Sequence, residues 1–438
     1  MTSILTNNGA MVALQTLQSI NSNLTDTQNE ISTGKKVANA QDNSAVWAIS
    51  KVMESDVKGF EAISSSLSLG DSTVAVARNA AESISDALID IKEKIISAQE
   101  ENVDRAKLQE DITALRDQIS SISGAAQFNG LNLLSNTDST AGSGTMSVLS
   151  SLDRAADGTV TAKNIDVKKQ DLGQGATDWS TGTAVAAGAG TTISGPLDGA
   201  AVTALNGAAT PNTTTLVIDS VTAGTGVQIN ISGSSAAATG VGAAFNTTGT
   251  EISYVGRDGD SQADVANALA KAFNDRVADA IEAGTLDADT TIAAAVTVAA
   301  DGVATITFTG DQEAGDNFSL QARETTGVTI GGGLEDLADI DVSTAAGATS
   351  ALEKIEGLIQ TATDAAAAFG SSAGRIETQS NFVSKLTDSL KSGIGSMVDA
   401  DMEAASARLK ALQTQQQLGV QALSIANSAP QTLQQLFR

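Results

Sequence analysis

The chain has 438 residues with 51 acidic and 25 basic side chains, so its formal net charge is -26, a balance that disfavours binding to nucleic acid or to anionic membrane surfaces. It contains no Cys and no His, which excludes disulfides, thiol chemistry and every catalytic or zinc site that depends on histidine. No stretch reaches the 18 apolar residues expected of a membrane span, and residues 1–8 lack the basic start and apolar stretch of a cleaved secretory signal.

Both ends of the chain carry an apolar stripe with a heptad-like spacing. At the N-terminus the stripe consists of Ala13, Leu17, Ile20, Leu24, Thr27 and Ile31. At the C-terminus it consists of Met402, Ala405, Leu409, Leu412, Gln416, Gly419, Leu423, Ala426, Pro430, Leu433 and Phe437. A spacing near 3.5 residues predicts a helix with one seam that a partner helix covers. Two amphipathic helices of an ordinary globular core are the alternative explanation.

The same two ends are free of charge. Residues 1–25 and 411–437 carry no charged side chain, although solvated helix faces in an acidic protein normally carry Glu and Lys. An uncharged, amide-lined surface suits the close packing of identical copies, or the wall of a narrow channel. Disordered polar tails are the rival explanation, and tails that fold only on assembly fit both the stripe and the lack of charge. The predicted assembly residues are Leu14, Leu17, Ile20, Leu24, Ile31, Leu409, Leu412, Leu423, Leu433, Leu436 and Phe437.

Further helices are predicted between these ends. The N-terminal half contains amphipathic stretches at 42–69, 72–99 and 103–122, with Asp71 or Ser72 able to cap the second. After the middle of the chain, stretches at 351–369 and 374–411 return as helix.

The middle, from about residue 136 to 345, is rich in Gly, Thr, Ser and Ala and shows short alternating runs. Segments 216–221 and 227–231 flank a Gly-containing turn and predict one hairpin, and segments 296–299 and 303–309 predict another. A single helix is predicted where apolar residues recur every four positions, at Val265, Leu269, Phe273, Val277 and Ile281.

Few side chains in this region suggest a ligand site. Asp258, Asp260 and Asp264 could form a calcium loop, but they lack the spacing of an EF-hand and are better explained as a turn that caps the helix beginning near Gln262. Gly331-Gly332-Gly333 has no phosphate-binding motif around it and is interpreted as a linker. Trp47 and Trp179 are expected to pack structurally. The sequence therefore predicts no catalytic, cofactor-binding or metal-binding residues.

Four runs of residues resemble bacterial flagellins. The run from Ile4 to Leu14, which begins Ile4-Leu5-Thr6-Asn7-Asn8, and the run from Ser32 to Ala45 resemble the flagellin N-terminal region. Gln127-Phe128-Asn129-Gly130 is similar to the flagellin signature that follows the second long helix of the rod domain. The run from Asn427 to Arg438 resembles the flagellin C-terminus, including Pro430 and the final Arg. The resemblance covers about the first 175 and the last 90 residues, and residues 251–325 resemble an insert found in some flagellins and hook-associated proteins.

The resemblance implies an α+β fold, with long α-helical coiled-coil and rod domains built from both termini and a β-rich central insert that contains one helix. The implied domains are a terminal inner-tube coiled-coil domain of residues 1–42 with 398–438, a helical rod domain with a small β region of residues 43–175 with 346–397, and a variable β-rich surface domain of residues 176–345.

The implied function is that of a structural subunit, not an enzyme, which polymerises into the extracellular bacterial flagellar filament for motility. The implied partners are further copies of the chain, hook-associated junction and cap proteins, and an export chaperone that binds near residues 400–438, with no nucleic acid, membrane or cofactor. Export would proceed through a type III flagellar apparatus with the chain unfolded. A hook–filament junction protein and a secreted surface adhesin, whose insert would bind glycan or calcium, are the alternatives.

Overall fold

The computed structural model describes most of the chain and divides it into two compact units. The described residues are all except 1–6, 156–158, 187–189, 191, 199–202, 206–210, 234–244, 246–250, 283, 288–289, 312–317 and 437–438. The first unit comprises Met1–Ser66, Ser150–Lys163 and Thr378–Arg438, and the second comprises Leu67–Leu149 and Asn164–Glu377. Both units therefore combine segments from distant parts of the sequence.

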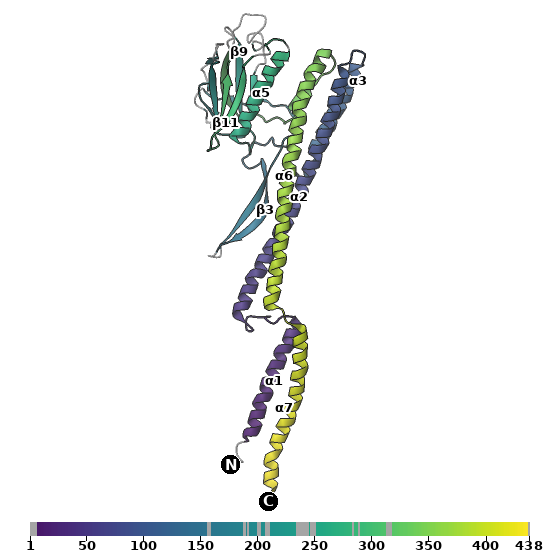
Figure 1. Ribbon diagram of the computed structural model, residues 1–438, viewed down its shortest axis with the longest axis vertical. Coiled ribbons are helices and arrows are strands. Elements are labelled where there is room, and N and C mark those ends of the chain that lie inside the picture. The colour runs from purple at the N-terminus through teal and green to yellow at the C-terminus, as the bar shows by residue number, and fades with distance from the viewer. Residues whose placement is uncertain are drawn as a thin grey trace. The chain divides into compact units, whose positions relative to one another are not determined.

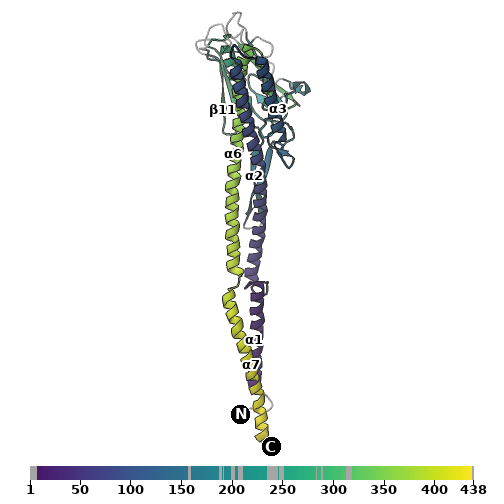
Figure 2. The same cartoon turned by 90° about the vertical axis from the view of Figure 1, so that its right-hand side faces the viewer.

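Within the first unit, the two ends of the chain pair as antiparallel helices. Helix α1 (Asn8–Thr33) and helix α7 (Met402–Leu436) lie side by side in both views of the ribbon, with both termini at the same end (Figures 1 and 2). At the other end of the pair, the Lys36 N–H donates to the Val398 carbonyl oxygen at 2.7 Å, and the Ala400 N–H donates to the Gly34 carbonyl oxygen at 3.0 Å. These hydrogen bonds join the segment that follows α1, residues 34–36, to the segment that precedes α7, residues 398–400.

Two long helices, α2 (Ser44–Ala98) and α6 (Ala345–Val398), contribute to both units. Each is continuous, so the predicted interruptions near residues 70 and 370 are wrong. The Ser72 hydroxyl donates to the Ser68 carbonyl oxygen one turn earlier at 2.8 Å instead of capping a new helix. The real break lies at residues 399–401, where the Asp401 carboxylate accepts from the Glu403 and Ala404 N–H groups and caps α7.

Within the second unit, side chains join these helices to one another and to a third. Lys92 of α2 forms an ion pair with Glu356 of α6, and Lys94 of α2 forms one at 3.6 Å with Asp111 of α3 (Arg105–Ala125). The Asp104 side chain caps α3, and a short hairpin of β1 (Gln127–Phe128) and β2 (Leu131–Asn132) follows it.

The hairpin of β3 (Thr145–Arg154) and β4 (Val160–Lys168) packs its apolar side chains against glycines of α2. Val148 lies where a Cβ at Gly70 would be, and Leu152 lies where one at Gly59 would be. No helix in the described part of the chain is long and apolar enough to cross a bilayer.

The insert holds two antiparallel sheets over one apolar core. One sheet has the strand order β11-β12-β8-β6, and the other has the order β10-β9-β13-β5, with β7 also paired to β13. Their bounds are β5 Thr183–Ala184, β6 Ile193–Ser194, β7 Thr203–Leu205, β8 Thr213–Ile218, β9 Thr225–Gly233, β10 Glu251–Val255, β11 Ala293–Val298, β12 Ala304–Thr309 and β13 Phe318–Thr326, with 3-10 turns at Trp179–Thr181 and Glu335–Asp339.

Helix α5 (Gln262–Glu282) contributes Val265, Leu269, Phe273 and Val277 to the same core, as the four-residue spacing predicts. The Phe273 ring lies 5.0 Å from the Phe308 ring of β12 and 6.5 Å from the Phe318 ring of β13. One helix thus packs against strands of both sheets.

One predicted hairpin is confirmed and the other is wrong. Strands β11 and β12 pair antiparallel through a turn at Gly302, as predicted, with Val298 opposite Ala304. Strands β8 and β9 do not pair, because β8 hydrogen-bonds to β12 in one sheet while β9 hydrogen-bonds to β10 and β13 in the other. Both strands bury alternate side chains in the shared core, so the segment between them crosses from one sheet to the other.

Candidate assembly interface

The predicted seam on α1 is the covered face of that helix. Ala13, Leu17, Ile20, Leu24 and Ile31 are half-buried and Thr27 is buried, while most other residues of the helix are exposed. The Thr27 hydroxyl donates to the Asn23 carbonyl oxygen at 2.8 Å, so its polar atom is satisfied within the helix. The heptad spacing therefore identified the face that α7 covers.

The predicted seam on α7 is buried or half-buried at every described side chain except one. Ala405 and Leu412 are buried, and Leu409, Gln416, Gly419, Leu423 and Ala426 are half-buried, whereas Met402 at the start of the helix is exposed. Leu433 and Leu436 lie within α7, but their side chains, that of Pro430 and all of Phe437 fall outside the described residues.

Amide side chains hold the two helices in register. The Asn7 Nδ2 donates to the Ala426 carbonyl oxygen at 2.8 Å, and the Gln416 Nε2 donates to Asn21 Oδ1 at 2.8 Å. Between them, a Cβ at Gly419 would lie 3.0 Å from Leu17 Cδ1, so the absence of a side chain there lets the leucine approach the α7 backbone. Uncharged polar residues therefore join the pair where a solvated coiled coil would carry charged ones.

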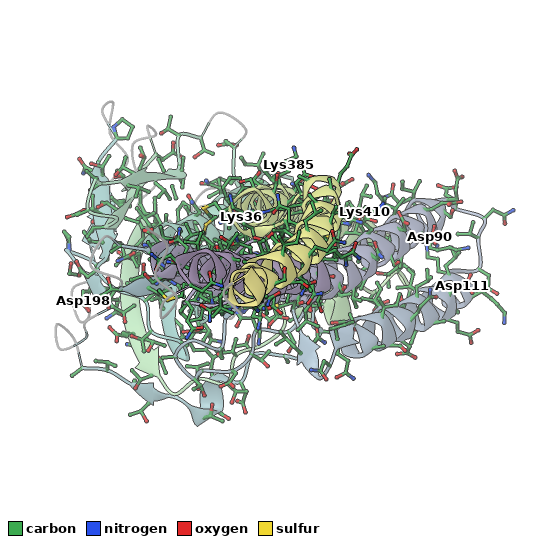
Figure 3. The ribbon with its side chains drawn as sticks, turned by 90° about the horizontal axis from the view of Figure 1, so that it is seen from below. Lys36, Asp90, Asp111, Asp198, Lys385 and Lys410 are labelled. Carbon is green, nitrogen blue, oxygen red and sulfur yellow. The ribbon has the colours of Figure 1, made fainter. Side chains whose placement is uncertain are left out.

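A second group of apolar side chains on these helices is left uncovered. We refer to Met11, Val12, Leu14, Leu418, Val420 and Ile425 as the exposed apolar set. Their exposed fractions run from 46% at Leu14 to 70% at Ile425. All six lie within the charge-free stretches 1–25 and 411–437, and charged residues such as Lys36 and Lys410 lie outside them (Figure 3). The surface is thus apolar and uncharged, and the described part of the chain leaves it uncovered.

Of the described residues in the predicted assembly list, only Leu14 belongs to this exposed apolar set. Leu17, Ile20, Leu24, Ile31, Leu409, Leu412 and Leu423 face the seam between α1 and α7. The other five members, Met11, Val12, Leu418, Val420 and Ile425, were missed because they lie off the heptad stripe. Their signal in the sequence is an apolar residue that lies outside the stripe but within a charge-free stretch of a helix.

The acidic residues considered for calcium belong to a cluster of polar side chains in the second unit, near the start of α5. Asp260 accepts a hydrogen bond from the Tyr254 hydroxyl at 2.8 Å, and Lys168 Nζ lies 3.2 Å from Asp260 Oδ1 and 2.8 Å from Asp264 Oδ2. Ser261 caps the helix, since its hydroxyl accepts from the Asp264 N–H, and the Asp264 carboxylate accepts from the Ser261 N–H in return. In the described part of the chain no three acidic side chains converge as metal ligands.

Charge pairing in this polar cluster lowers the pKa of Asp264 and raises the pKa of Lys168. Burial alone would raise the pKa of Asp264, but hydrogen bonds from Lys168 and from the Ser261 N–H outweigh it and lower that pKa. Burial would likewise lower the pKa of Lys168, and the hydrogen bond to Asp264 together with the charge of Asp260 raises it instead. Both groups therefore remain ionised over the physiological range.

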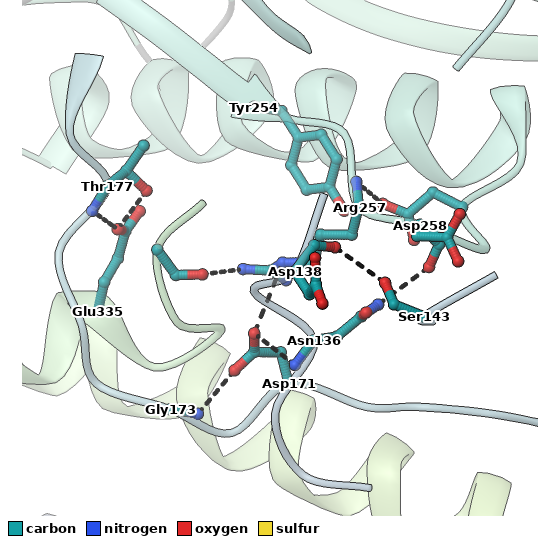
Figure 4. Close-up of polar contacts among 12 residues, drawn as sticks. Asn136, Asp138, Ser143, Asp171, Gly173, Thr177, Tyr254, Arg257, Asp258 and Glu335 are labelled. Carbon is teal, nitrogen blue, oxygen red and sulfur yellow. Dashed lines mark hydrogen bonds and ion pairs between the residues drawn. The ribbon is translucent and has the colours of Figure 1, made fainter. Parts of the chain in front are cut away.

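Asp171 is the buried acidic residue of a neighbouring group of polar contacts with Asn136 and Arg257 (Figure 4). Its side chain is 1% exposed, and its carboxylate accepts from the Asn136 N–H at 3.2 Å and the Gly173 N–H at 2.8 Å. Arg257 Nε lies 3.8 Å from the same carboxylate, and Arg257 Nη2 donates to the Gly331 carbonyl oxygen at 2.9 Å. Asn136 Nδ2 in turn donates to the Asp258 carbonyl oxygen at 3.0 Å. The group contains no nucleophile oriented by a base and is structural.

The prediction that Gly331-Gly332-Gly333 is a linker is wrong. A Cβ at Gly332 would lie 2.1 Å from the Gly173 carbonyl oxygen, and one at Gly333 would lie 2.1 Å from the Asp171 carbonyl oxygen. The three glycines allow two backbone segments to pack directly against each other. Trp179 packs against Val255, Val328 and Ile330 nearby, which confirms its structural role.

Comparison with known proteins agrees with the resemblance at both ends. The family pattern for the bacterial flagellin N-terminal helical region matches residues 4–139, and that for the C-terminal helical region matches residues 352–437. Flagellin A of Rhizobium meliloti is 36% identical over 441 residues, and Flagellin B of the same organism is 38% identical over 441 residues, each match covering 100% of both chains. Among solved structures, FliC from Burkholderia pseudomallei is 15% identical and covers 70% of this chain and 99% of its own, with a TM-score of 0.30.

The matched regions contain the terminal helix pair, and the full-length relatives extend across the insert as well. The chain therefore belongs to the bacterial flagellins, the non-enzymatic structural subunits of the extracellular flagellar filament.

Proposed function

We propose that this flagellin polymerises through the exposed apolar set of α1 and α7, while the seam residues hold the two helices of one subunit together. The supporting observation is that Met11, Val12, Leu418, Val420 and Ile425 are more than half exposed and lie in the parts of α1 and α7 that carry no charge, residues 8–25 and 411–436. The predicted assembly residues then divide into two roles. Leu14 contacts neighbouring copies, and Leu17, Ile20, Leu24, Ile31, Leu409, Leu412 and Leu423 form the intramolecular seam.

Burial of this set supplies free energy where charge repulsion is absent. Fully burying one such side chain contributes roughly 1.5–3 kcal/mol. Like charges stacked at the short spacing of packed helices would oppose association at the low dielectric of an interface. A chain with a net charge of -26 can therefore associate with itself most favourably through its neutral ends.

The domain division extends this proposal. Residues 1–42 with 398–438 would form the inner tube of the filament, residues 43–175 with 346–397 the surrounding helical layer, and residues 176–345 the outer surface. Leu433, Leu436 and Phe437 would contact neighbouring copies at the end of α7. Hook-associated junction and cap proteins would meet the same terminal helices at the two ends of the filament.

Export in an unfolded state through a type III flagellar apparatus completes the proposal, with a chaperone covering residues 400–438 before secretion. Support comes from family membership and from the weakness of the terminal helices, which hold Gly, Gln and Thr on their seams. Such helices are marginal in isolation and gain most of their stability from packing.

Two valines of equal exposure provide the test. Val420 in α7 is 54% exposed and Val298 in β11 is 53% exposed, so an aspartate at either position is solvated in the monomer. Val420→Asp is expected to raise the critical concentration for seeded filament growth at least about tenfold, which corresponds to about 1.4 kcal/mol. Val298→Asp is expected to leave it unchanged. Growth is followed by light scattering and electron microscopy.

The far-ultraviolet circular dichroism of both monomers is compared first, so that a folding defect is separated from an assembly defect. Normal filament growth by the Val420→Asp chain would show that subunits join through another surface. A matching loss in the Val298→Asp chain would show that added charge impairs assembly irrespective of its position.

A further inference from the structure

The insert presents a strand edge that is uncharged and only partly covered. Among the strands that the structure describes, β11 is the outer strand of its sheet and is bonded to β12 on one side. Its residues from Ala293 to Val298 carry no charge, and Val298 is 53% exposed. An open edge of this kind is a template on which another chain can add a strand.

The register of the hairpin shows which residues face outward. The Ala299 N–H donates to the Val303 carbonyl oxygen at 2.9 Å, which places residue 299 in a hydrogen-bonded pair with β12. Such pairs alternate along an antiparallel ladder. Ala293, Ala295 and Thr297 therefore bond to β12, and Ala294, Val296 and Val298 direct their backbone N–H and carbonyl groups to the open edge.

A side chain of α5 occupies the first of these outward positions. Asn274 Nδ2 donates to the Ala294 carbonyl oxygen at 3.0 Å, and the Ala294 N–H donates to Asn274 Oδ1 at 2.8 Å. The amide thus makes the two hydrogen bonds that a neighbouring strand would make. Beyond it, only the outward groups of Val296 and Val298 extend along the strand, too short a stretch to hold a second strand firmly.

We propose that Asn274 is an edge cap that prevents β11 of one copy from pairing antiparallel with β11 of a second copy. The occupant it excludes is a second copy, because the strand is uncharged and its three outward residues are complementary to themselves in a two-fold arrangement: 294 opposite 298, and 296 opposite 296. A chain that self-associates at high concentration needs this edge closed so that copies join elsewhere. The need to close the edge rests on the proposed function, in which copies of the chain assemble through their terminal helices.

Disulfide trapping tests the proposal in the full-length chain, which has no Cys of its own. In the excluded pairing, residue 296 would face its counterpart at a Cα separation of about 5.5 Å, within reach of a disulfide. Val296→Cys is combined with Asn274→Ala, or with Asn267→Ala as the matched control. Asn267 is exposed on the same helix, seven residues earlier, and makes no comparable hydrogen bond to β11 among the described residues. Both changes improve helix propensity equally.

With a mild oxidant, the Asn274→Ala chain is expected to form disulfide-linked dimers at least tenfold faster than the Asn267→Ala chain. Equal rates in these two chains overturn the proposal. A third chain carries Asn274→Asp, which loses the bond to the Ala294 carbonyl oxygen but places a charge at the edge. Its dimers are expected to form no faster than in the control. Fast cross-linking of this chain would show that a loosened insert, not an open edge, drives pairing.

This readout reports on β11 alone. If the terminal helices are not the assembly surface, the growth of the Val420→Asp chain reveals it, while the order of the three cross-linking rates is unaffected.

Discussion

A single glycine shows how much of the terminal pair depends on one residue. In the sequence, Gly419 interrupts an apolar stripe and lowers the stability expected of an isolated helix. In the structure it lies opposite Leu17, with Ile20 Cδ1 also within 4 Å of the position a Cβ would take. The missing side chain therefore sets how closely α1 and α7 approach.

Enlarging this residue should separate the two helices. Gly419→Leu is expected to lower the temperature at which filaments depolymerise, because the new side chain displaces Leu17 from the seam. Gly419→Ala is expected to have a small net effect, since a gain of about 1 kcal/mol in helix propensity offsets a contact that Leu17 can relieve. Gly370→Leu in α6 is the control, as nothing lies within 4 Å of its Cβ position. Equal stability of the Gly419→Leu and unchanged filaments would contradict this packing.

At the same scale, the sequence predicted the seam but only one residue, Leu14, of the exposed apolar set. A 3.5-residue repeat selects one face of a helix, and that face proved to be the one that the chain's own partner helix covers. Val12, Val420 and Ile425 are exposed residues outside this repeat, and the proposed reason for an apolar residue there is a neighbouring molecule, which a single sequence does not contain. The Asp171–Arg257 pair was missed because its partners are distant in sequence and acquire meaning only once the backbone segments meet.

Among the elements, helices were easier to predict than their ends, and strands easier than their partners. Asp71 or Ser72 was predicted to cap a new helix after residue 69, yet α2 continues because Gly70 leaves room for Val148 to pack and the Ser72 hydroxyl bonds back to its own helix. Strands β8 and β9 were correctly found as strands. A local turn signal could not show that β12 and β13 provide their hydrogen-bond partners.

The start of α5 offers an acid-dependent test. The lowered pKa of Asp264 means that its interaction with Lys168 contributes stability that is present above the usual carboxyl pKa of 3.8 and is lost as the pH falls through the lower folded value. Lys168→Met should raise the titration midpoint of Asp264, measured by NMR, because the hydrogen bond and charge of Lys168 are lost while burial and the Ser261 hydrogen bonds remain. Lys168→Arg should preserve the low midpoint. An unchanged midpoint in the Lys168→Met chain would rule out the pairing.

Across the whole molecule, the net charge is distributed unevenly between the two units, and the unit that contains the terminal helices is nearly neutral. Acidic and basic side chains nearly balance in the unit formed by Met1–Ser66, Ser150–Lys163 and Thr378–Arg438. Almost all of the net charge of -26 therefore belongs to the unit that contains the insert. The order of helical ends around a β-rich middle was predictable from Gly and Pro usage, and the pairing of the ends from their shared spacing. The arrangement of the two sheets was not, because it follows from long-range pairing.

A cryo-electron microscopy map of the filament tests the central claim most directly. The side chains of Met11, Val12, Leu14, Leu418, Val420 and Ile425 should be buried against α1 and α7 of neighbouring copies, with no charged residue in the contact. A map in which these six side chains face solvent, while the subunits touch only through other surfaces, would contradict the account.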